Sequence, residues 1–209
     1  MIPRPTPLYH ITSVQNLPLI LRVGGLLCSN LLDLPGSEYT NIAYSAIQER
    51  RARKAVPCGP GGTIYSYVPF FFGPRPLMLF TINKGNVPGA MQADIIYLVT
   101  TVETVSKSGR SFVFTDGHAV SAFTRFFDDL LHLDKVPWEV MFQPTWSNTM
   151  DNPDRMRRRQ SEFLVHWLAP WRLILEIGVI DSRMRTRVLQ LLDNAEPKPV
   201  VRVRRGWYY

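Results

Sequence analysis

The chain has 209 residues, of which 45% are hydrophobic, enough to bury a full core in a single domain. Its 24 Lys and Arg against 17 Asp and Glu give a net charge of +7, which favours a polyanionic partner such as nucleic acid without proving one. Two cysteines without paired spacing argue against a disulfide framework and a structural metal site, and the lack of a leader or a membrane-length apolar run predicts a cytoplasmic protein that does not enter a membrane.

The first third of the chain predicts a strand followed by a helix. Residues 8–12 (LYHIT) form an apolar run after three spaced prolines, so we expect a strand that contains His10. Ser13 or Asn16 would cap the next helix, and the glycine pair at 24–25 would end it. The other elements predicted in this part are a loop over residues 31–40, a helix over 42–54, a glycine-rich turn over 58–63 and a strand over 64–72.

The remainder of the chain mixes strands and helices without regular alternation. Strands are predicted over residues 78–82, 95–99, 112–115, 162–167, 173–180 and 200–204. Helices are predicted over residues 119–133, from a cap at Asp151 or Asn152 with Pro153 at the first helical position, and from Ser182 to residue 192. Because no repeat or linker divides the chain, we predict one α+β domain over residues 1–209.

Familiar nucleotide-binding and hydrolase motifs are absent from the sequence. It has no GxxxxGK[ST] phosphate loop and no GxGxxG after a strand, which disfavours P-loop and Rossmann enzymes. It also has no GxSxG elbow, and its four histidines are scattered, which disfavours a serine hydrolase. The chemistry must therefore come from another constellation of residues.

Three polar residues are candidates for a site, and each has a structural alternative. His10 lies inside a strand, where a histidine more often makes structural hydrogen bonds than ligand contacts. Arg51 belongs to the basic run 50–54, which is either a solvated helix face or a site where a guanidinium pairs with a phosphate or a base edge. Glu162 starts a strand directly after an arginine cluster, either as an edge-strand glutamate or as a carboxylate held by positive charge.

A second set of residues suits single-stranded nucleic acid. Aromatic rings stack on bases, while arginines and amides contact phosphates. The candidates are Trp146, Asn148, Arg155, Arg157, Arg158 and Arg159. Arg202 and Arg204 alternate on the last strand and would either extend a binding groove or form a polar sheet surface.

Seven segments, taken in order, resemble one known family over nearly the whole chain. They are LYHIT (8–12), IAYSAIQERR (42–51), YVPFFF (67–72), PLMLF (76–80), FVFTDGHA (112–119), SEFLV (161–165) and the terminal WYY. This ordered set resembles the DarT family of DNA ADP-ribosyltransferases. The resemblance implies an ADP-ribosyltransferase fold, a split β-sandwich with peripheral helices whose cleft holds NAD.

The resemblance also assigns roles to residues. It implies NAD contacts at His10, Ile11 and Thr12, near Leu19 and Leu27, and over an NAD-binding element at about residues 34–53. The implied catalytic residues are Arg51 and Glu162, and a loop over residues 117–162 would shape the DNA site. No metal is implied.

The function implied is that of a toxin. It would transfer ADP-ribose from NAD to a base in single-stranded DNA, with thymine preferred over guanine, release nicotinamide and block replication. The expected partners are single-stranded DNA and a DarG-type antitoxin whose macrodomain removes ADP-ribose, and the protein is expected to be a monomer. The alternatives are a non-catalytic basic domain that binds nucleic acid, or a transferase that acts on RNA or protein.

The chemistry explains why a carboxylate and a guanidinium are needed. Cleavage of the nicotinamide bond develops oxocarbenium character at the ribose carbon, which Glu162 would stabilise. A guanidinium is a poor base, so any part of Arg51 in proton removal would run through a relay with Glu162. Replacing Glu162 with Ala is expected to abolish transfer while sparing stability, because an edge carboxylate contributes little to a core.

Overall fold

The computed structural model describes residues 2–32 and 39–209 of the protein. Its strands are β1 (Pro7–Ser13), β2 (Gly25–Leu27), β3 (Tyr67–Phe71), β4 (Ile95–Thr101), β5 (Phe112–Thr115), β6 (Phe126–Phe127), β7 (Glu162–His166), β8 (Leu168–Pro170), β9 (Glu176–Val179) and β10 (Val200–Val203). Its α-helices are α1 (Leu17–Arg22), α2 (Ser29–Leu32), α3 (Ser45–Arg53), α4 (Leu77–Asn83), α5 (Val102–Lys107), α6 (Trp138–Met141), α7 (Arg155–Arg158) and α8 (Ser182–Leu191). Short 3-10 helices lie at Val14–Asn16, Ile64–Ser66, Gln92–Asp94, Leu130–Lys135, Trp171–Leu173 and Arg205–Trp207. The mixed α+β prediction is confirmed.

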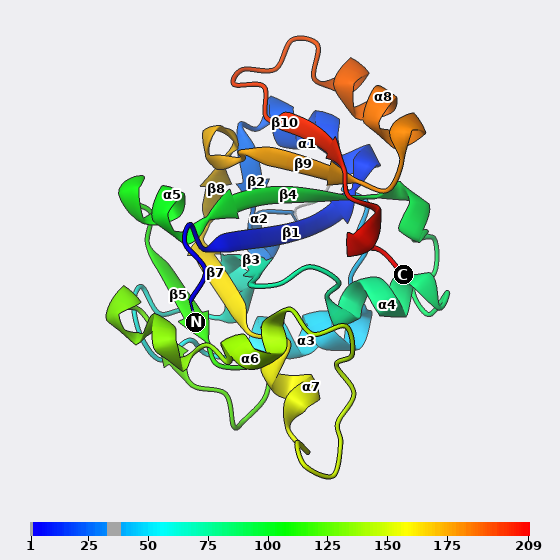
Figure 1. Cartoon of the computed structure of the whole chain (residues 1–209). Helices are drawn as coiled ribbons and strands as arrows, with labels where there is room; N and C mark the ends of the chain where they lie inside the picture. Colours follow the sequence, from blue (N-terminus) through cyan, green and yellow to red (C-terminus); the bar gives the residue numbers. More distant parts are fainter. Residues whose placement is uncertain (1, 33–38) are drawn as a thin grey trace.

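The main sheet has eight strands in the order β10-β9-β4-β1-β3-β7-β5-β6 and consists of two halves. β1 pairs with β4 along its whole length but meets β3 at the pair Tyr9–Phe71. Figure 1 shows the consequence: β10, β9, β4 and β1 run side by side, while β3, β7 and β5 cross them at an angle. β2 and β8 form a small second sheet. The short junction at β1 and β3 opens the space in which the candidate site lies.

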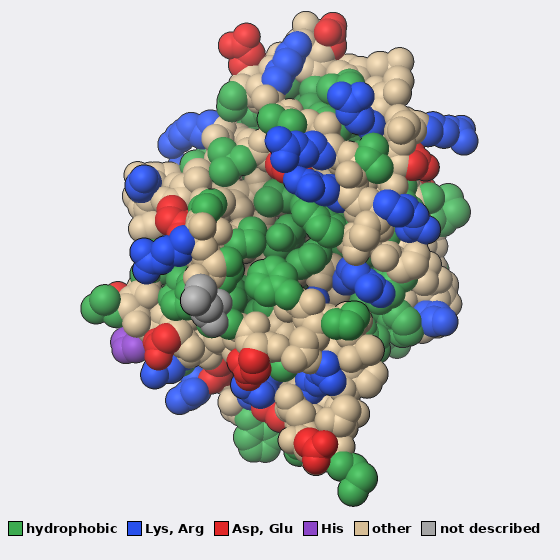
Figure 2. Space-filling view, in the orientation of Figure 1, with side chains coloured by type: hydrophobic (Ala, Val, Ile, Leu, Met, Phe, Trp, Pro, Cys, Tyr) green, Lys and Arg blue, Asp and Glu red, His purple; other side chains and the backbone are tan. Residues whose placement is uncertain are grey.

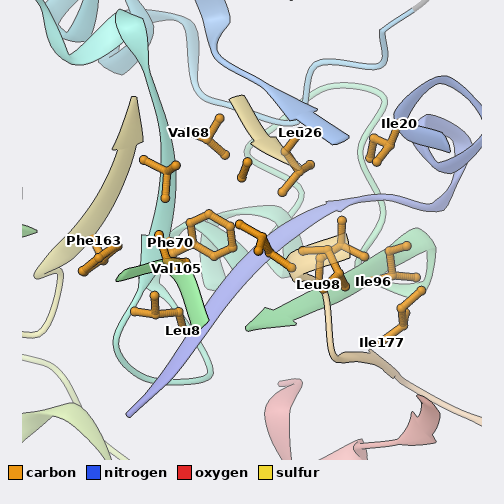
Figure 3. Close-up of a cluster of buried hydrophobic side chains, with 14 of the residues drawn as sticks. Leu8, Ile20, Leu26, Val68, Phe70, Ile96, Leu98, Val105, Phe163 and Ile177 are labelled. Carbon is orange, nitrogen blue, oxygen red and sulfur yellow. The ribbon is translucent and has the colours of Figure 1, made fainter. Parts of the chain in front are cut away.

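A large hydrophobic core holds the two halves together. Its side chains come from both halves of the sheet and from α1, α5, α6 and α8. Figure 3 shows part of this core, with labels on Leu8, Ile20, Leu26, Val68, Phe70, Ile96, Leu98, Val105, Phe163 and Ile177. A second cluster joins β1 and β4 to α4 and to Tyr208 near the C-terminus. Hydrophobic burial on this scale fixes the strands that carry the polar site residues.

The predicted strand over residues 78–82 is wrong, because this segment forms the helix α4. Pro76 stands at the N-cap, where its missing N–H costs no hydrogen bond. Leu79 and Ile82 are both buried and lie three residues apart, on one face of the helix. A short apolar run fits either element, and here packing against the second hydrophobic cluster selects the helix.

The predicted helix over residues 119–133 is also wrong. The chain makes a turn, then the two-residue strand β6, then a 3-10 helix. β6 pairs with β5, and the Asp116 carboxylate accepts a hydrogen bond from the Arg125 backbone N–H at 2.9 Å. Phe123, which lies within the predicted helix, is 85% exposed. The helical spacing of the phenylalanines is therefore coincidental, since two of them serve the short strand.

Two helix caps differ from the predicted ones. α7 begins at Arg155 after Asp154, so neither Asp151 nor Asn152 is its cap and Pro153 lies before the helix. α8 is capped by Asp181, whose carboxylate accepts from the Met184 N–H at 2.8 Å, and Ser182 is the first helical residue. No helix of the described residues is long and apolar enough to cross a membrane.

Candidate active site

A cavity of about 690 Å³ lies where the two halves of the sheet separate. Its walls come from β1, β3, α3, α4 and the start of β7. The structure brings together there the predicted residues His10, Ile11, Leu27, Arg51 and Glu162. These residues are up to 152 positions apart in the chain, so only the fold unites them.

Glu162 is the first residue of β7, which lies between β3 and β5 in the interior of the sheet. The expectation of an edge-strand glutamate is therefore wrong. Its residue exposure is 1%, and its carboxylate accepts from Arg51 Nη1 at 2.7 Å and from the Ala119 N–H at 3.1 Å. The Glu162 N–H donates to Thr115 Oγ1 at 2.9 Å. The carboxylate is thus a buried acceptor with a fixed direction.

Arg51 projects from the last turn of α3 toward Glu162. Its side chain is 11% exposed, so the solvated-face alternative does not hold for this member of the basic run. Its second terminal nitrogen, Nη2, is buried and has no hydrogen-bond partner among the described residues, and the same is true of Gln48 Oε1. Both residues line the cavity. Unsatisfied buried donors and acceptors are costly, so these atoms fit a polar ligand such as a dinucleotide.

His10 makes a structural hydrogen bond and also lines the cavity, so both alternatives for this residue apply. Its Nδ1 lies 2.8 Å from the Pro69 carbonyl oxygen, which can only accept, so Nδ1 carries the proton. Burial lowers the pKa of His10 to about 4, and the ring is therefore neutral at physiological pH. The ring also lines the cavity. One nitrogen anchors the side chain, and the neutral ring forms part of the wall.

The remaining residues predicted to contact NAD occupy different positions. Thr12 is buried, accepts a hydrogen bond from Asn16 Nδ2 at 3.0 Å and is not part of the cavity lining. Leu19 lies on α1 and is not part of the lining. Residues 34–38 of the predicted NAD-binding element lie outside the described residues, whereas much of its segment 39–51 lines the cavity.

The comparisons with known proteins agree with this geometry. Residues 9–209 match the family described as "ssDNA thymidine ADP-ribosyltransferase, DarT". The chain belongs to the DarT family. It is 42% identical to the DNA ADP-ribosyl transferase of Thermus sp. (strain 2.9), with 99% of this chain and 98% of that protein aligned.

Two solved structures of DarT from Thermus sp. 2.9 share the fold of this DarT-family protein. The complex with ADP-ribosylated ssDNA superposes with a TM-score of 0.93 at 41% identity, covering 100% of this chain and 99% of that chain. The complex with NAD+ gives a TM-score of 0.88 at 38% identity, with all of both chains covered. The predicted ADP-ribosyltransferase fold is thereby confirmed.

The arginine cluster of this DarT-family protein is paired with groups of its own loop and of neighbouring segments. Arg155 bonds to Gln143, Arg158 bonds to Glu139, and Arg157 bonds to Asp154 and Asp116. Arg159 is 6% exposed and donates to the Pro74 carbonyl oxygen at 2.5 Å, so it presents no charge to solvent. Much of the cluster therefore holds the 117–162 loop in shape.

Trp146 and Asn148, the other two loop residues predicted to contact DNA, also make contacts within the protein. Trp146 Nε1 donates to the Tyr209 hydroxyl at 3.1 Å, and its ring meets Phe80 edge-on at 5.0 Å between centroids. The Asn148 side-chain oxygen accepts from the Met156 N–H at 2.8 Å. The C-terminal tyrosine thus anchors the loop next to α4.

Positive charge is also present away from the loop. Figure 2 shows Lys and Arg side chains gathered over the end formed by β10 and α8, with acidic side chains between them. There Arg204 makes a bidentate pair with Glu176, at 2.6 and 2.9 Å, and Arg202 lies 3.6 Å from the same carboxylate. Of the two alternatives for these arginines, the structure matches the polar sheet surface.

Several cavity residues were missed by reasoning from the sequence. His118 lines the cavity, and burial lowers its pKa although the nearby Glu162 carboxylate opposes that shift. Gln160 lines it too, two residues before Glu162. His118 belongs to the FVFTDGHA segment, which carried the family resemblance, and it lies between the predicted strand 112–115 and the predicted helix 119–133. Among the described residues, no group of three or more His, Cys, Asp and Glu could hold a metal ion.

Proposed function

We propose that the protein transfers ADP-ribose from NAD to a thymine in single-stranded DNA and releases nicotinamide. The observation that carries this proposal is the buried Arg51–Glu162 pair in a cavity of about 690 Å³, in a chain of the DarT family. Support comes from the similar Thermus structures, whose complexes contain NAD+ and ADP-ribosylated ssDNA.

Glu162 stabilises the developing positive charge. As the bond between ribose and nicotinamide breaks, nicotinamide leaves with the bonding electron pair and the ribose carbon gains oxocarbenium character. A carboxylate fixed by the Arg51 guanidinium and the Ala119 N–H needs no reorganisation to face that charge. Preorganisation of this kind favours the transition state over the bound substrates.

Arg51 and Glu162 also handle the acceptor. A thymine ring nitrogen forms the new bond to the ribose carbon and loses its proton, which the Glu162 carboxylate accepts. The free Nη2 of Arg51 holds the NAD phosphates or a carbonyl of the base in line. His10, Ile11, Leu27 and Gln48 form the NAD wall, of which Thr12 and Leu19 are not part.

The 117–162 loop receives the DNA strand in this proposal. Arg155, Arg157 and Arg158 keep partial exposure and lie next to phosphates, whereas Trp146, Asn148 and Arg159 hold the loop in shape. Arg50, which lines the cavity, and Arg53, three residues further along α3, are exposed and add positive charge to this helix. Phosphate contacts of this type position a strand without reading its sequence.

In a cell this activity makes the protein a toxin. ADP-ribose on a DNA base blocks the template during replication, so the producing cell needs an antitoxin of the DarG type with an ADP-ribose-removing macrodomain. The family resemblance supports this partner. We place the reaction in the cytoplasm, with the protein acting as a monomer.

The test is incubation of the protein with NAD and short single-stranded oligonucleotides. We expect a mass increase of one ADP-ribose on thymine-containing DNA, with an equal amount of nicotinamide released. Guanine-only DNA, RNA of the same sequence and acceptor proteins form the comparison arms, and modification of one of these instead would redirect the proposal to that acceptor. Glu162→Gln should lose transfer, while Glu176→Gln, a carboxylate outside the cavity, should keep it.

An additional measurement separates the enzyme from a non-catalytic domain that binds nucleic acid. We expect NAD to raise the unfolding temperature of the protein, because a ligand that binds only the folded state stabilises it. Steeply salt-dependent binding to DNA with no response to NAD would favour the non-catalytic alternative.

A further inference from the structure

A short turn connects the catalytic carboxylate to the protein surface. The turn consists of residues 118–124 and is named the 118–124 turn below. Its first residue, His118, lines the cavity, and its second, Ala119, donates to Glu162 Oε1 at 3.1 Å. The Val120 carbonyl oxygen accepts from Arg50 Nη2 at 3.5 Å. The turn therefore starts at the cavity, where its backbone contacts both Glu162 and Arg50.

Hydrogen bonds fix the shape of the 118–124 turn. The His118 carbonyl oxygen accepts from the Ser121 N–H at 2.9 Å and from Thr124 Oγ1 at 2.8 Å. Arg157 braces both ends: its carbonyl oxygen accepts from the His118 N–H at 2.9 Å, and its Nη1 donates to Thr124 Oγ1 at 3.0 Å. Gly117 permits this bracing, because a Cβ there would overlap the Arg157 guanidinium. A residue in this turn is held in place before any ligand arrives.

Phe123 lies in this fixed turn with 85% of its surface exposed. Single exposed hydrophobic residues are ordinary on protein surfaces. Phe123 differs because it is aromatic, is held by a braced turn and stands four residues from the N–H that binds Glu162. The other aromatic side chain considered for stacking, Trp146, is engaged with Tyr209 and Phe80. An exposed aromatic ring in a fixed turn that starts at the cavity suits an unpaired base.

We propose that Phe123 stacks on the base adjacent to the acceptor base in single-stranded DNA and thereby sets the register of the strand. This inference rests on the proposed function and names a residue that positions its substrate. Stacking uses the face of a base, so it tolerates many sequences but favours bases of large area. Because the turn is preorganised, little conformational freedom is lost when the strand docks. Phe123 is thus a DNA-positioning residue that does not touch NAD.

Substitutions of Phe123 test this role. Phe123→Ala should lower kcat/KM for the oligonucleotide by roughly 5- to 150-fold, the range expected when one base–aromatic stack is lost. Phe123→Trp should keep activity, whereas Phe123→Leu, which is apolar but lacks a ring, should behave like the alanine variant. Met91→Ala removes another exposed apolar side chain, outside the cavity and the loop, and should change nothing. The KM for NAD and the unfolding temperature should be the same in all of these proteins.

Modified oligonucleotides identify the stacked base. An abasic residue placed on one side of the acceptor should reduce the activity of the unsubstituted protein as much as Phe123→Ala does. On that abasic substrate Phe123→Ala should cause no further loss, since the two changes remove the same contact. Equal effects of Phe123→Ala on intact and abasic DNA, or full activity of Phe123→Ala on every substrate, would overturn the proposal.

The same assays separate failure of this inference from failure of the proposed function. If the unsubstituted protein transfers no ADP-ribose to any DNA, the proposed function fails. If it transfers ADP-ribose and Phe123→Ala transfers it equally well, only the role of Phe123 fails. A Phe123→Ala variant that keeps full DNA activity but no longer binds a protein antitoxin would reassign the ring to protein recognition and overturn base stacking.

Discussion

Removal of the Glu162 carboxylate should affect both stability and activity. Glu162→Ala leaves the Arg51 guanidinium, 11% exposed, without its partner, and leaves the Ala119 N–H without an acceptor. Breaking a buried ion pair from one side costs about 3–5 kcal/mol. Because Arg51 borders a cavity and can turn toward solvent, we expect the lower end, about 3 kcal/mol. For a chain of this size that corresponds to a fall of about 6–12 °C in the unfolding temperature.

Thermal and urea unfolding at pH 7, without NAD or DNA, measure this effect. Glu162→Gln retains the size and an acceptor oxygen and should lose less stability than Glu162→Ala, although both should lose transfer. Asp134→Ala breaks a solvent-exposed pair with Lys135 and should leave the unfolding temperature unchanged. An unfolding temperature for Glu162→Ala equal to that of the unsubstituted protein would refute the argument from burial. Transfer by Glu162→Gln at the full rate would refute the catalytic role.

Two further predictions follow from the cavity wall and the braced turn. Gly117→Ala should displace the Arg157 guanidinium and lower kcat/KM for DNA without changing the KM for NAD, and unchanged kinetics for both substrates would contradict this. Burial lowers the pKa of His10 from 6.5 to about 4, so the unfolded chain takes up a proton before the folded one. Stability should therefore fall as the pH drops from about 6.5 toward 4, and His10→Asn should flatten that fall when unfolding free energies are compared at pH 7 and pH 4.5. Equal pH dependence in the two proteins would exclude this contribution.

Several strands could be predicted from the sequence because they are buried on both faces. β1 and β7 are runs of apolar residues at the centre of the sheet, and such runs stand out among polar loops. β5 was predicted with its observed bounds. These strands carry His10 and Glu162, so the prediction placed two site residues on the correct elements.

Segments whose structure depends on distant partners could not be predicted in the same way. α4 has an apolar run that fits a strand or a helix, and contacts with the second hydrophobic cluster decide between them. The phenylalanines between residues 119 and 133 have helical spacing, yet Phe126 and Phe127 pair with β5 and Phe123 faces solvent. The spacing of apolar residues shows which side chains tend to be buried, but it does not show which distant residues they pack against.

The local sequence gave no sign that Arg51 and Glu162 meet. They are 111 residues apart, and their contact requires β7 to insert between β3 and β5 so that its first residue faces α3. The family resemblance supplied both residues, whereas the pattern around Glu162 left open an edge-strand glutamate and a carboxylate held by positive charge. The position of Glu162 also changes the expected stability of Glu162→Ala. Removing a carboxylate at a sheet edge costs little stability, whereas removing a buried, paired one costs several kcal/mol.

The sequence did not show which arginines are paired within the protein and which are exposed. A run such as RMRRR is typical of a solvent-facing surface, but in the fold Arg157 pairs with Asp116, Arg158 pairs with Glu139, and Arg159 is buried. Asp116 immediately precedes the loop, and Glu139 lies within it. For the basic run 50–54 the sequence left two alternatives, a solvated helix face and a contact with a phosphate or a base edge, and the exposed Arg50 of this run lines the cavity. The electrostatic attraction of DNA should therefore be sought along α3 as well as on the loop. Substitution of Arg53 should reduce the salt dependence of DNA binding by about one phosphate contact.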